Sequence, residues 1–285
     1  MIFKFGAPLT RSAIFLVLPL TDPASPSIVR STLPNFSSLS KSVFFRDSSA
    51  DFASTIGIGS SVWTSLNGLP SPKELHTFLI VMIYASKFER QLMKSLGSAV
   101  KLVDETVGFR YFDSRDLGFI DGTANPESVD GQASTLIAAE DDPNAAGGSY
   151  ILVQKYLHDL TAWQALSAEK QEQIIGRTKF DNIELGDAED DQQCSHKNLN
   201  TVEDANGEER DILRDNMTFG SLGSGEFGTY FIGYTGRLWV KEKMVERIFV
   251  GHPPGLHDRI LDYSKPVTGA VFFAPSVDVL QGLAD

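Results

Sequence analysis

The stretch Tyr150–Leu157, Tyr-Ile-Leu-Val-Gln-Lys-Tyr-Leu, decides the fold because the pattern of the first half of the chain begins again there. Its composition is typical of a strand, as is that of the apolar run Ala13–Leu20 near the N-terminus. A polar connection rich in aspartate and glycine, running from the segment Gly118–Pro126 to Gly148, separates the two series of elements. The sequence therefore predicts two consecutive units of one kind.

The first unit contains short strands and short amphipathic helices. The helix at 87–96 is the clearest, because Phe88, Leu92 and Leu96 follow a helical spacing. The expected strands are Ala13–Leu20, Ser42–Arg46, Ala53–Gly59, Leu79–Ala85 and Val100–Val107, and the expected helices are Ser25–Leu33, Ser60–Leu66 and Lys87–Leu96.

The second unit follows the same order. Ser167 is a good helix cap, so we expect the helix at 161–175 to break there. The expected strands are Tyr150–Leu157, Asn198–Val202, Gly228–Tyr234 and Gly269–Ala274, and the expected helices are Thr161–Ile175 and Leu238–Val250.

The first six elements of the first unit and the six elements of the second unit follow the order β-α-β-β-α-β, which is that of a ferredoxin-like unit with helices on one face of an antiparallel sheet. We therefore expect an α+β protein with a duplicated ferredoxin-like fold, similar to a dimeric α+β barrel. The expected halves are 1–120 and 121–285. This boundary places Asp121 at a junction, where pockets tend to form.

Composition excludes several classes of protein. The 285 residues include 25 basic and 37 acidic ones, so the net charge is 25 − 37 = −12, which argues against a nucleic-acid binder. Cys194 is the single cysteine, so no internal disulfide can form. The run Ala13–Leu20 is too short to span a bilayer, and we interpret it as a buried strand rather than a secretory signal. We expect a cytoplasmic protein with no membrane partner.

Three polar residues are candidates for a functional site, and each also has an ordinary structural explanation. His196 could bind a metal or a haem iron, but a surface histidine is the commoner case. Asp121, followed by Gly122, could be a catalytic carboxylate or the first residue of an Asx turn. Arg214 could stabilise negative charge in a dry pocket or form a weak surface ion pair. Residue types alone leave these alternatives open.

Several motifs together resemble those of the dye-decolorising peroxidases, of the bacterial-type class B branch. The longest is Gly108–Pro126, Gly-Phe-Arg-Tyr-Phe-Asp-Ser-Arg-Asp-Leu-Gly-Phe-Ile-Asp-Gly-Thr-Ala-Asn-Pro. The others are Ile175–Lys179, Ser195-His196, Arg214–Gly220 and Pro266–Gly269. The resemblance covers the chain from about Thr10 onward, and it implies two ferredoxin-like halves around haem b.

The resemblance also implies a role for individual residues. The implied haem site comprises His196 as the proximal ligand of the iron, Asp121, Arg214 and Asn216 as distal catalytic residues, Arg177 as a contact of a haem propionate, and Asp262 as the acceptor for the second nitrogen of His196. Asp258 and Glu209 are alternatives for the last role. The implied activity is the reduction of hydrogen peroxide with oxidation of dyes, phenols or other small aromatic donors, in a homo-oligomer.

Two departures from the family pattern keep other functions open. The chain is about twenty residues shorter than the family between Phe78 and Leu79. It is also one residue shorter at Asp116–Gly118, close to Asp121. A haem carrier or sensor with little peroxidase turnover is the first alternative, and a binding module that has lost the cofactor is the second. A chlorite dismutase-like enzyme is disfavoured by the segment Gly118–Gly122.

Overall fold

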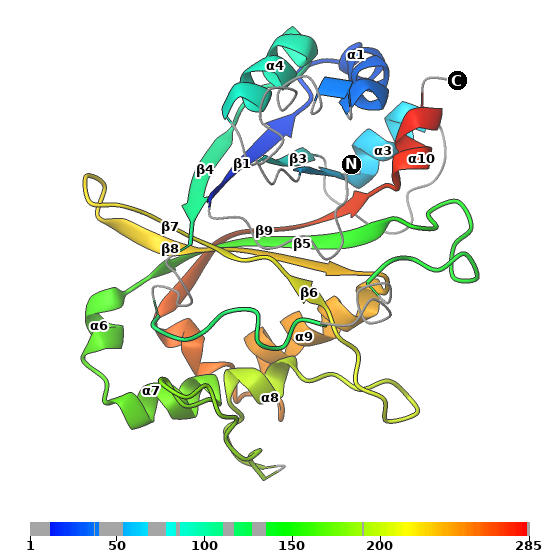
Figure 1. Ribbon diagram of the computed structural model, residues 1–285. Coiled ribbons are helices and arrows are strands. Elements are labelled where there is room, and N and C mark those ends of the chain that lie inside the picture. Colours follow the sequence, from blue (N-terminus) through cyan, green and yellow to red (C-terminus); the bar gives the residue numbers. More distant parts are fainter. Residues whose placement is uncertain are drawn as a thin grey trace.

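The computed structural model describes residues 12–36, 38–39, 54–67, 78–83, 86–110, 117–126, 135–189 and 191–283. The expected strand Ser42–Arg46 lies outside these residues. Within them, nine strands form one sheet that consists of two similar halves. Figure 1 shows this sheet across the middle of the molecule, with one group of helices on each side.

The N-terminal half is a four-stranded antiparallel sheet in the order β4-β1-β3-β2. Its strands are β1 (Ser12–Pro19), β2 (Ser54–Ile58), β3 (Phe78–Ile83) and β4 (Asp104–Phe109), and its helices are α1 (Ser25–Thr32), α3 (Ser60–Asn67) and α4 (Ser86–Leu96), with short 3-10 turns at Leu33–Asn35 and Gly97–Ala99. Phe78 and Leu79, where the chain is shorter than the family pattern, both lie inside β3 and pair with β1.

The C-terminal half repeats this arrangement with the order β9-β5-β8-β7. Its strands are β5 (Ser149–His158), β7 (Met217–Ser221), β8 (Glu226–Thr235) and β9 (Ser264–Ala274), with the short β6 (Leu213–Arg214) also paired to β8. Its helices are α6 (Leu160–Gln164), α7 (Ala168–Ile175), α8 (His196–Asn200) and α9 (Leu238–Val250), followed by the 3-10 helix η3 (Arg259–Asp262) and by α10 (Val277–Gly282).

Numbered along the chain, the four main strands of each half have the spatial order 4-1-3-2, which confirms the duplicated ferredoxin-like fold. The halves join at both edges, through the pair Ile58 with Phe273 and the pair Phe109 with Thr218. The sheet is therefore closed into a barrel. Helices α1, α3, α4 and α10 cover the N-terminal half, and α6 to α9 cover the C-terminal half (Figure 1).

The main hydrophobic core fills the space between the two halves and the space under the N-terminal helices. Between the halves, Phe15 stacks on Tyr230 with ring centroids 4.1 Å apart. Under the N-terminal helices, Phe36 meets Phe88 edge to face at 4.9 Å, and both side chains are fully buried. Such aromatic pairs add about 0.5–1.5 kcal/mol beyond the burial of their area.

Most expected elements are confirmed, including α9 with its predicted bounds and the break before α7, where the Ser167 side chain accepts from the Lys170 amide. The expected strand at 198–202 is wrong. Residues 198–200 are instead the last part of α8, which begins at His196 because the Ser195 hydroxyl caps the helix at the Asn198 amide. The strand that completes the half is β7, whose Gly220 and Ser221 weaken the apolar pattern.

Among the described residues, no helix is both long and apolar enough to cross a membrane. The longest described helix, α9, has 13 residues, whereas a spanning helix needs about 20.

Candidate functional site

A cavity of about 310 Å³ lies between the sheet and the helices of the C-terminal half. One wall is the helix-facing side of the sheet, where the side chains of register partners on neighbouring strands lie in rows across the sheet. Leu152 and Arg214 are both register partners of Gly233, and Gln154 is the partner of Phe231. Because alternate residues of a strand face the same side, these rows bring distant parts of the chain to one surface.

The opposite wall is formed by α8, α9 and the residues of η3. His196 is the first residue of α8, and Met244, Val245 and Ile248 of α9 and Ile260 of η3 also line the cavity. The loop 117–126 closes a further side with Phe119, Ile120 and Asp121. The cavity is thus mainly apolar, with a few polar groups on two facing walls, as expected of a site for a small organic ligand.

His196 is oriented by a buried carboxylate. Its Nδ1 lies 2.6 Å from Oδ2 of Asp258, whose side chain is 0% exposed. The second oxygen of Asp258 accepts from the Ile260 amide and so caps η3. The Asn200 amide nitrogen lies 3.4 Å from Nδ1 and 3.3 Å from Nε2, so it is not aligned with the lone pair of either. The imidazole therefore donates from Nδ1 and keeps Nε2 for a ligand.

The expectation that Asp262 binds His196 is wrong. Asp262 accepts from Arg259 Nε at 2.6 Å and from His257 Nε2 at 3.1 Å. It is the last residue of η3, whereas Asp258 precedes the helix as its cap, so the two carboxylates point in different directions. Asp258, one of the alternatives, is the acceptor.

Where the sheet wall meets the loop 117–126, the amide of Asn216 lies next to the carboxylate of Asp121. The Nδ2 group of Asn216 lies 3.3 Å from Oδ1 of Asp121 and donates to it. Asn216 is 3% exposed, and its Oδ1 has no hydrogen-bond partner among the described residues. A buried amide oxygen without a partner is costly, which is typical of a site that a ligand completes.

Arg214 is held next to this pair by its own backbone. Its amide donates to Asn125 Oδ1 at 2.8 Å, and Asn125 Nδ2 donates to the Arg214 carbonyl at 2.8 Å. Arg110 holds the two residues that follow Arg214. It donates to Asp215 at 2.7 Å and to the Asn216 carbonyl at 2.9 Å. The sequence predicted neither role, since neither leaves a local pattern.

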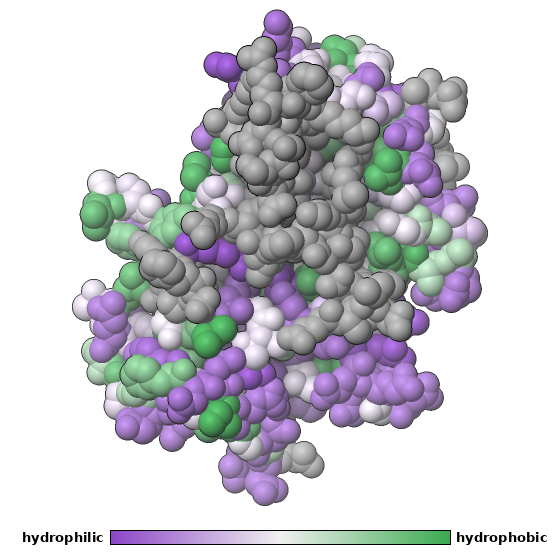
Figure 2. All heavy atoms as spheres, in the orientation of Figure 1, coloured by the Kyte–Doolittle hydropathy of each residue, from purple (hydrophilic) through white to green (hydrophobic). Residues whose placement is uncertain are grey.

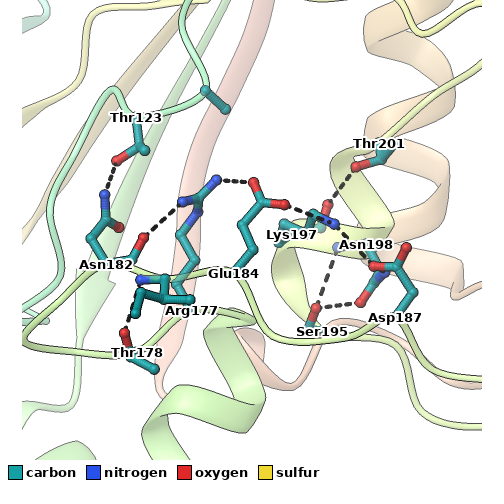
Figure 3. A network of polar contacts seen from close by, with 12 residues as sticks. Thr123, Arg177, Thr178, Asn182, Glu184, Asp187, Ser195, Lys197, Asn198 and Thr201 are labelled. Atoms are coloured by element: carbon teal, nitrogen blue, oxygen red, sulfur yellow. Dashed lines mark hydrogen bonds and ion pairs between the residues drawn. The ribbon is translucent and has the colours of Figure 1, made fainter.

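Arg177 lies on the rim of the cavity, just after α7. Gly176 ends α7 with φ 90° and packs closely against Ser195, so Arg177 follows next to the start of α8. Figure 3 shows the Arg177 guanidinium between the Asn182 carbonyl and the Glu184 carboxylate, which also approaches Lys197.

Two further polar side chains border the cavity. Tyr156 donates to Gln154 Oε1 at 3.0 Å, and burial together with the charge of Asp258 raises the pKa of its phenol, which stays protonated. Lys241 of α9 is fully buried beside Gly233, and its Nζ has no hydrogen-bond partner among the described residues. Burial, and then the charge of Arg214, lower the pKa of Lys241 well below its ordinary value. The sequence analysis did not identify Lys241.

Five of the six predicted site residues therefore line one cavity: His196, Asp121, Arg214, Asn216 and Arg177. Within the described parts of the chain, no group of three or more histidine, cysteine, aspartate or glutamate side chains is arranged to hold a metal ion.

Comparisons with known proteins agree with this geometry. The model of the C-terminal part of Dyp-type peroxidases matches residues 113–279. A dye-decolorizing peroxidase from Mycolicibacterium paratuberculosis is 45% identical over 298 residues, which cover 96% of this chain and 83% of the relative. One from Mycobacterium tuberculosis is 42% identical over 298 residues, with 96% and 88% covered.

Solved structures show the same likeness. A variant of Rhodococcus jostii RHA1 DypB in complex with heme has a TM-score of 0.90 and 44% identity, with 98% of this chain and 97% of that chain covered. The encapsulated DyP-type peroxidase from Mycobacterium smegmatis has a TM-score of 0.88 and 42% identity, with 96% of each chain covered. The chain belongs to the Dyp-type, or dye-decolorising, peroxidases. It is an oxidoreductase that uses peroxide as its acceptor, together with a reductant.

Proposed function

We propose that the cavity of the C-terminal half is the haem b site of a peroxidase, with His196 as the proximal ligand and Asp121, Arg214 and Asn216 as the distal catalytic residues. The observation that carries this proposal is the arrangement of two unlike walls. A histidine oriented by Asp258 comes from the helices, and an acid, an amide and an arginine come from the opposite side.

The residues present fit a haem group. Nε2 of His196 is the nitrogen that the Asp258 hydrogen bond leaves for iron, and that bond makes the ligand more basic. Met244, Val245, Ile248 and Phe231 supply an apolar lining for a porphyrin. The relative from Rhodococcus jostii was solved in complex with heme. When bound, haem supplies the redox chemistry of peroxide reduction and of one-electron oxidation.

Asp121 and Asn216 handle the proton of the substrate. As a carboxylate, Asp121 takes the proton from one oxygen of hydrogen peroxide and returns it to the other, so that water is the leaving group. The Asn216 amide, which donates to Asp121, fixes the orientation of the carboxylate. Its unpartnered Oδ1 is a further acceptor for a ligand in the cavity.

Arg214 supplies a permanent positive charge. A guanidinium remains protonated at every accessible pH, so it stabilises the negative charge that develops as the O–O bond lengthens. The two hydrogen bonds between Asn125 and the Arg214 backbone join this charge to the loop that carries Asp121. Peroxide would therefore meet both groups in one fixed arrangement.

The reducing substrates that we propose are dyes, phenols and other small aromatic donors, supported by the naming of the relatives as dye-decolorizing peroxidases. A haem carrier or sensor with little turnover is disfavoured, because such a protein has no need of the acid and arginine opposite His196. Arg177 is proposed to contact a haem propionate, since it lies on the cavity rim.

We also propose a cytoplasmic homo-oligomer, with the halves dividing at 120/121. The boundary is supported by its place between β4, which ends at Phe109, and β5, which begins at Ser149. The encapsulated relative from Mycobacterium smegmatis supports a location inside the cell.

The test is the absorption spectrum of the protein with haem, before and after one equivalent of peroxide, for the wild type and His196→Ala. We expect a Soret band that depends on His196 and shifts when peroxide is added. A band that depends on His196 but ignores peroxide would favour the carrier or sensor. Failure of the wild type to bind haem specifically would reject the cofactor assignment.

A further inference from the structure

The rim of the cavity carries two cations that share one carboxylate of the protein. Glu184 contacts Arg177 Nη2 with Oε1, and its Oε2 lies 3.4 Å from Lys197 Nζ. All three side chains line the cavity, and Lys197 directly follows His196 on α8. Each oxygen of one carboxylate thus faces one cation, so the two cations are spaced to bind a single carboxylate (Figure 3).

Both cations have a second anchor that is independent of Glu184. Arg177 Nη1 donates to the Asn182 carbonyl at 3.2 Å, and Lys197 Nζ donates to Asp187 at 3.0 Å. Removing Glu184 would therefore leave both cations in place.

Glu184 itself is easily moved. Its side chain is 51% exposed, whereas that of Arg177 is 14% exposed and that of Lys197 is 24% exposed. The backbone of its turn is held separately, by the Thr178 amide on the Ile183 carbonyl and by the Leu185 amide on the Gly176 carbonyl. An ion pair with a half-exposed carboxylate contributes little to stability, so rotating Glu184 into solvent costs little.

The charges on the rim cancel in the present arrangement. Arg177 and Lys197 are positive and Glu184 and Asp187 are negative, which gives +2 − 2 = 0. If Glu184 turns away, one positive charge is left over, and a single carboxylate neutralises it. The surrounding surface over α7 and α8 is largely hydrophilic in Figure 2, which suits the carboxylate edge of a ligand whose apolar body is inside.

We propose that Glu184 is a built-in competitor for the cofactor's carboxylate. It occupies a two-cation site formed by Arg177 and Lys197, and it gives way when a haem propionate binds there. This inference rests on the proposed haem site, and it adds Lys197 as a second propionate contact and Glu184 as a group that weakens haem binding. The contrary role for Glu184 is to orient Arg177, in which case its loss would weaken binding.

The experiment is a titration of the haem-free protein with haem and with its dimethyl ester, which lacks the carboxylate charges, followed by tryptophan fluorescence quenching. For Glu184→Gln we expect haem to bind about threefold to fivefold tighter, the equivalent of one exposed ion pair, with the ester unchanged. For Lys197→Met we expect haem to bind about threefold weaker, again with the ester unchanged.

The pair Lys243 and Glu246 of α9 provides matched controls. It has the same residue types, a 2.8 Å ion pair and similar exposure of the glutamate, 56%, but neither residue lines the cavity. Glu246→Gln and Lys243→Met should leave both affinities unchanged.

Each other result overturns the inference. Weaker haem binding by Glu184→Gln would show that Glu184 positions Arg177, and an unchanged affinity would show that it does not compete. Equal tightening of haem and ester would show that the carboxylate is not the group concerned. If instead the wild type bound neither ligand in a His196-dependent manner, the proposed function itself would fail.

Discussion

The two halves share one strand order, yet the helix-facing sides of their sheets are filled differently. In the N-terminal half, Leu16, Leu18 and Ile56 face the helices and pack against Phe36 and Phe88 in a continuous apolar core. In the C-terminal half, the corresponding surface carries Gln154, Tyr156, Arg214 and Asn216 around a cavity. The fold is therefore common to both halves, whereas the candidate site depends on the side chains on one face of the C-terminal half.

The largest expected effect comes from removing one aromatic ring in each half. Phe88→Ala should lower the free energy of unfolding by about 3–5 kcal/mol, because the side chain is fully buried in a filled core. Phe231→Ala should cost less, because Phe231 already borders a cavity. Denaturant unfolding of the haem-free protein measures both changes.

Haem titration of the same two variants measures whether each ring contributes to haem binding. Phe231→Ala should weaken haem binding, while Phe88→Ala should leave the affinity of the folded fraction unchanged. Equal losses of stability, or weaker haem binding by Phe88→Ala alone, would contradict the assignment of structure to one half and function to the other.

The next effect is on peroxide chemistry. Arg214→Leu should slow the peroxide-dependent spectral change by about 10²–10³-fold while haem binding is retained, because a charge aimed at the developing transition state is lost. Stopped-flow absorbance measures the rate. Arg237→Leu is the control, since Arg237 is 45% exposed and does not line the cavity. An unchanged rate in Arg214→Leu would remove Arg214 from the catalytic residues.

A smaller effect is expected on the helical wall. Asp258→Asn should weaken haem binding by about tenfold, because a neutral amide makes His196 a less basic ligand. The haem titration measures the affinity, and the reduction potential of the bound haem should rise. Asp262→Asn is the matched control, because Asp262 pairs with Arg259 and His257 instead. The same shift in both variants would mean that Asp258 has no special connection to His196.

Much of the fold was predictable because it depends on local patterns. Ala13–Leu20 is a continuous apolar run and Leu238–Val250 carries a helical period, and both elements are found where expected. The α8 region was not predictable, since the segment 198–202 contains apolar residues that fit a strand. The cap by Ser195, a local hydrogen bond, decided for a helix.

The site shows the same division. Residues within a motif, such as Asp121 and His196, were predicted because their neighbours resemble a family, and both line the cavity. The partner of His196 was not, because Asp258 and Asp262 lie in one short segment, and only the direction of η3 distinguishes them. Lys241 of α9 had no motif at all, and its burial depends on a glycine of the sheet, Gly233 of β8.

Lys241 gives the expected effect that is most easily separated from catalysis. The buried amine has no hydrogen-bond partner in the described parts of the chain, so Lys241→Met should stabilise the haem-free protein by about 1–2 kcal/mol near pH 8. The pKa of Lys241 is lowered in the folded state, so between that pKa and the ordinary lysine pKa the unfolded chain binds more protons. The stability of the wild type should therefore rise with pH through this range, relative to Lys241→Met, and the difference should shrink as the pH approaches the ordinary lysine pKa.

Urea unfolding at several pH values measures both curves, with Lys243→Met, exposed on the same helix, as the control. A loss of stability in Lys241→Met would show that the amine makes a favourable polar contact in the folded protein. The burial of Lys241 would then need an explanation other than the space beside Gly233.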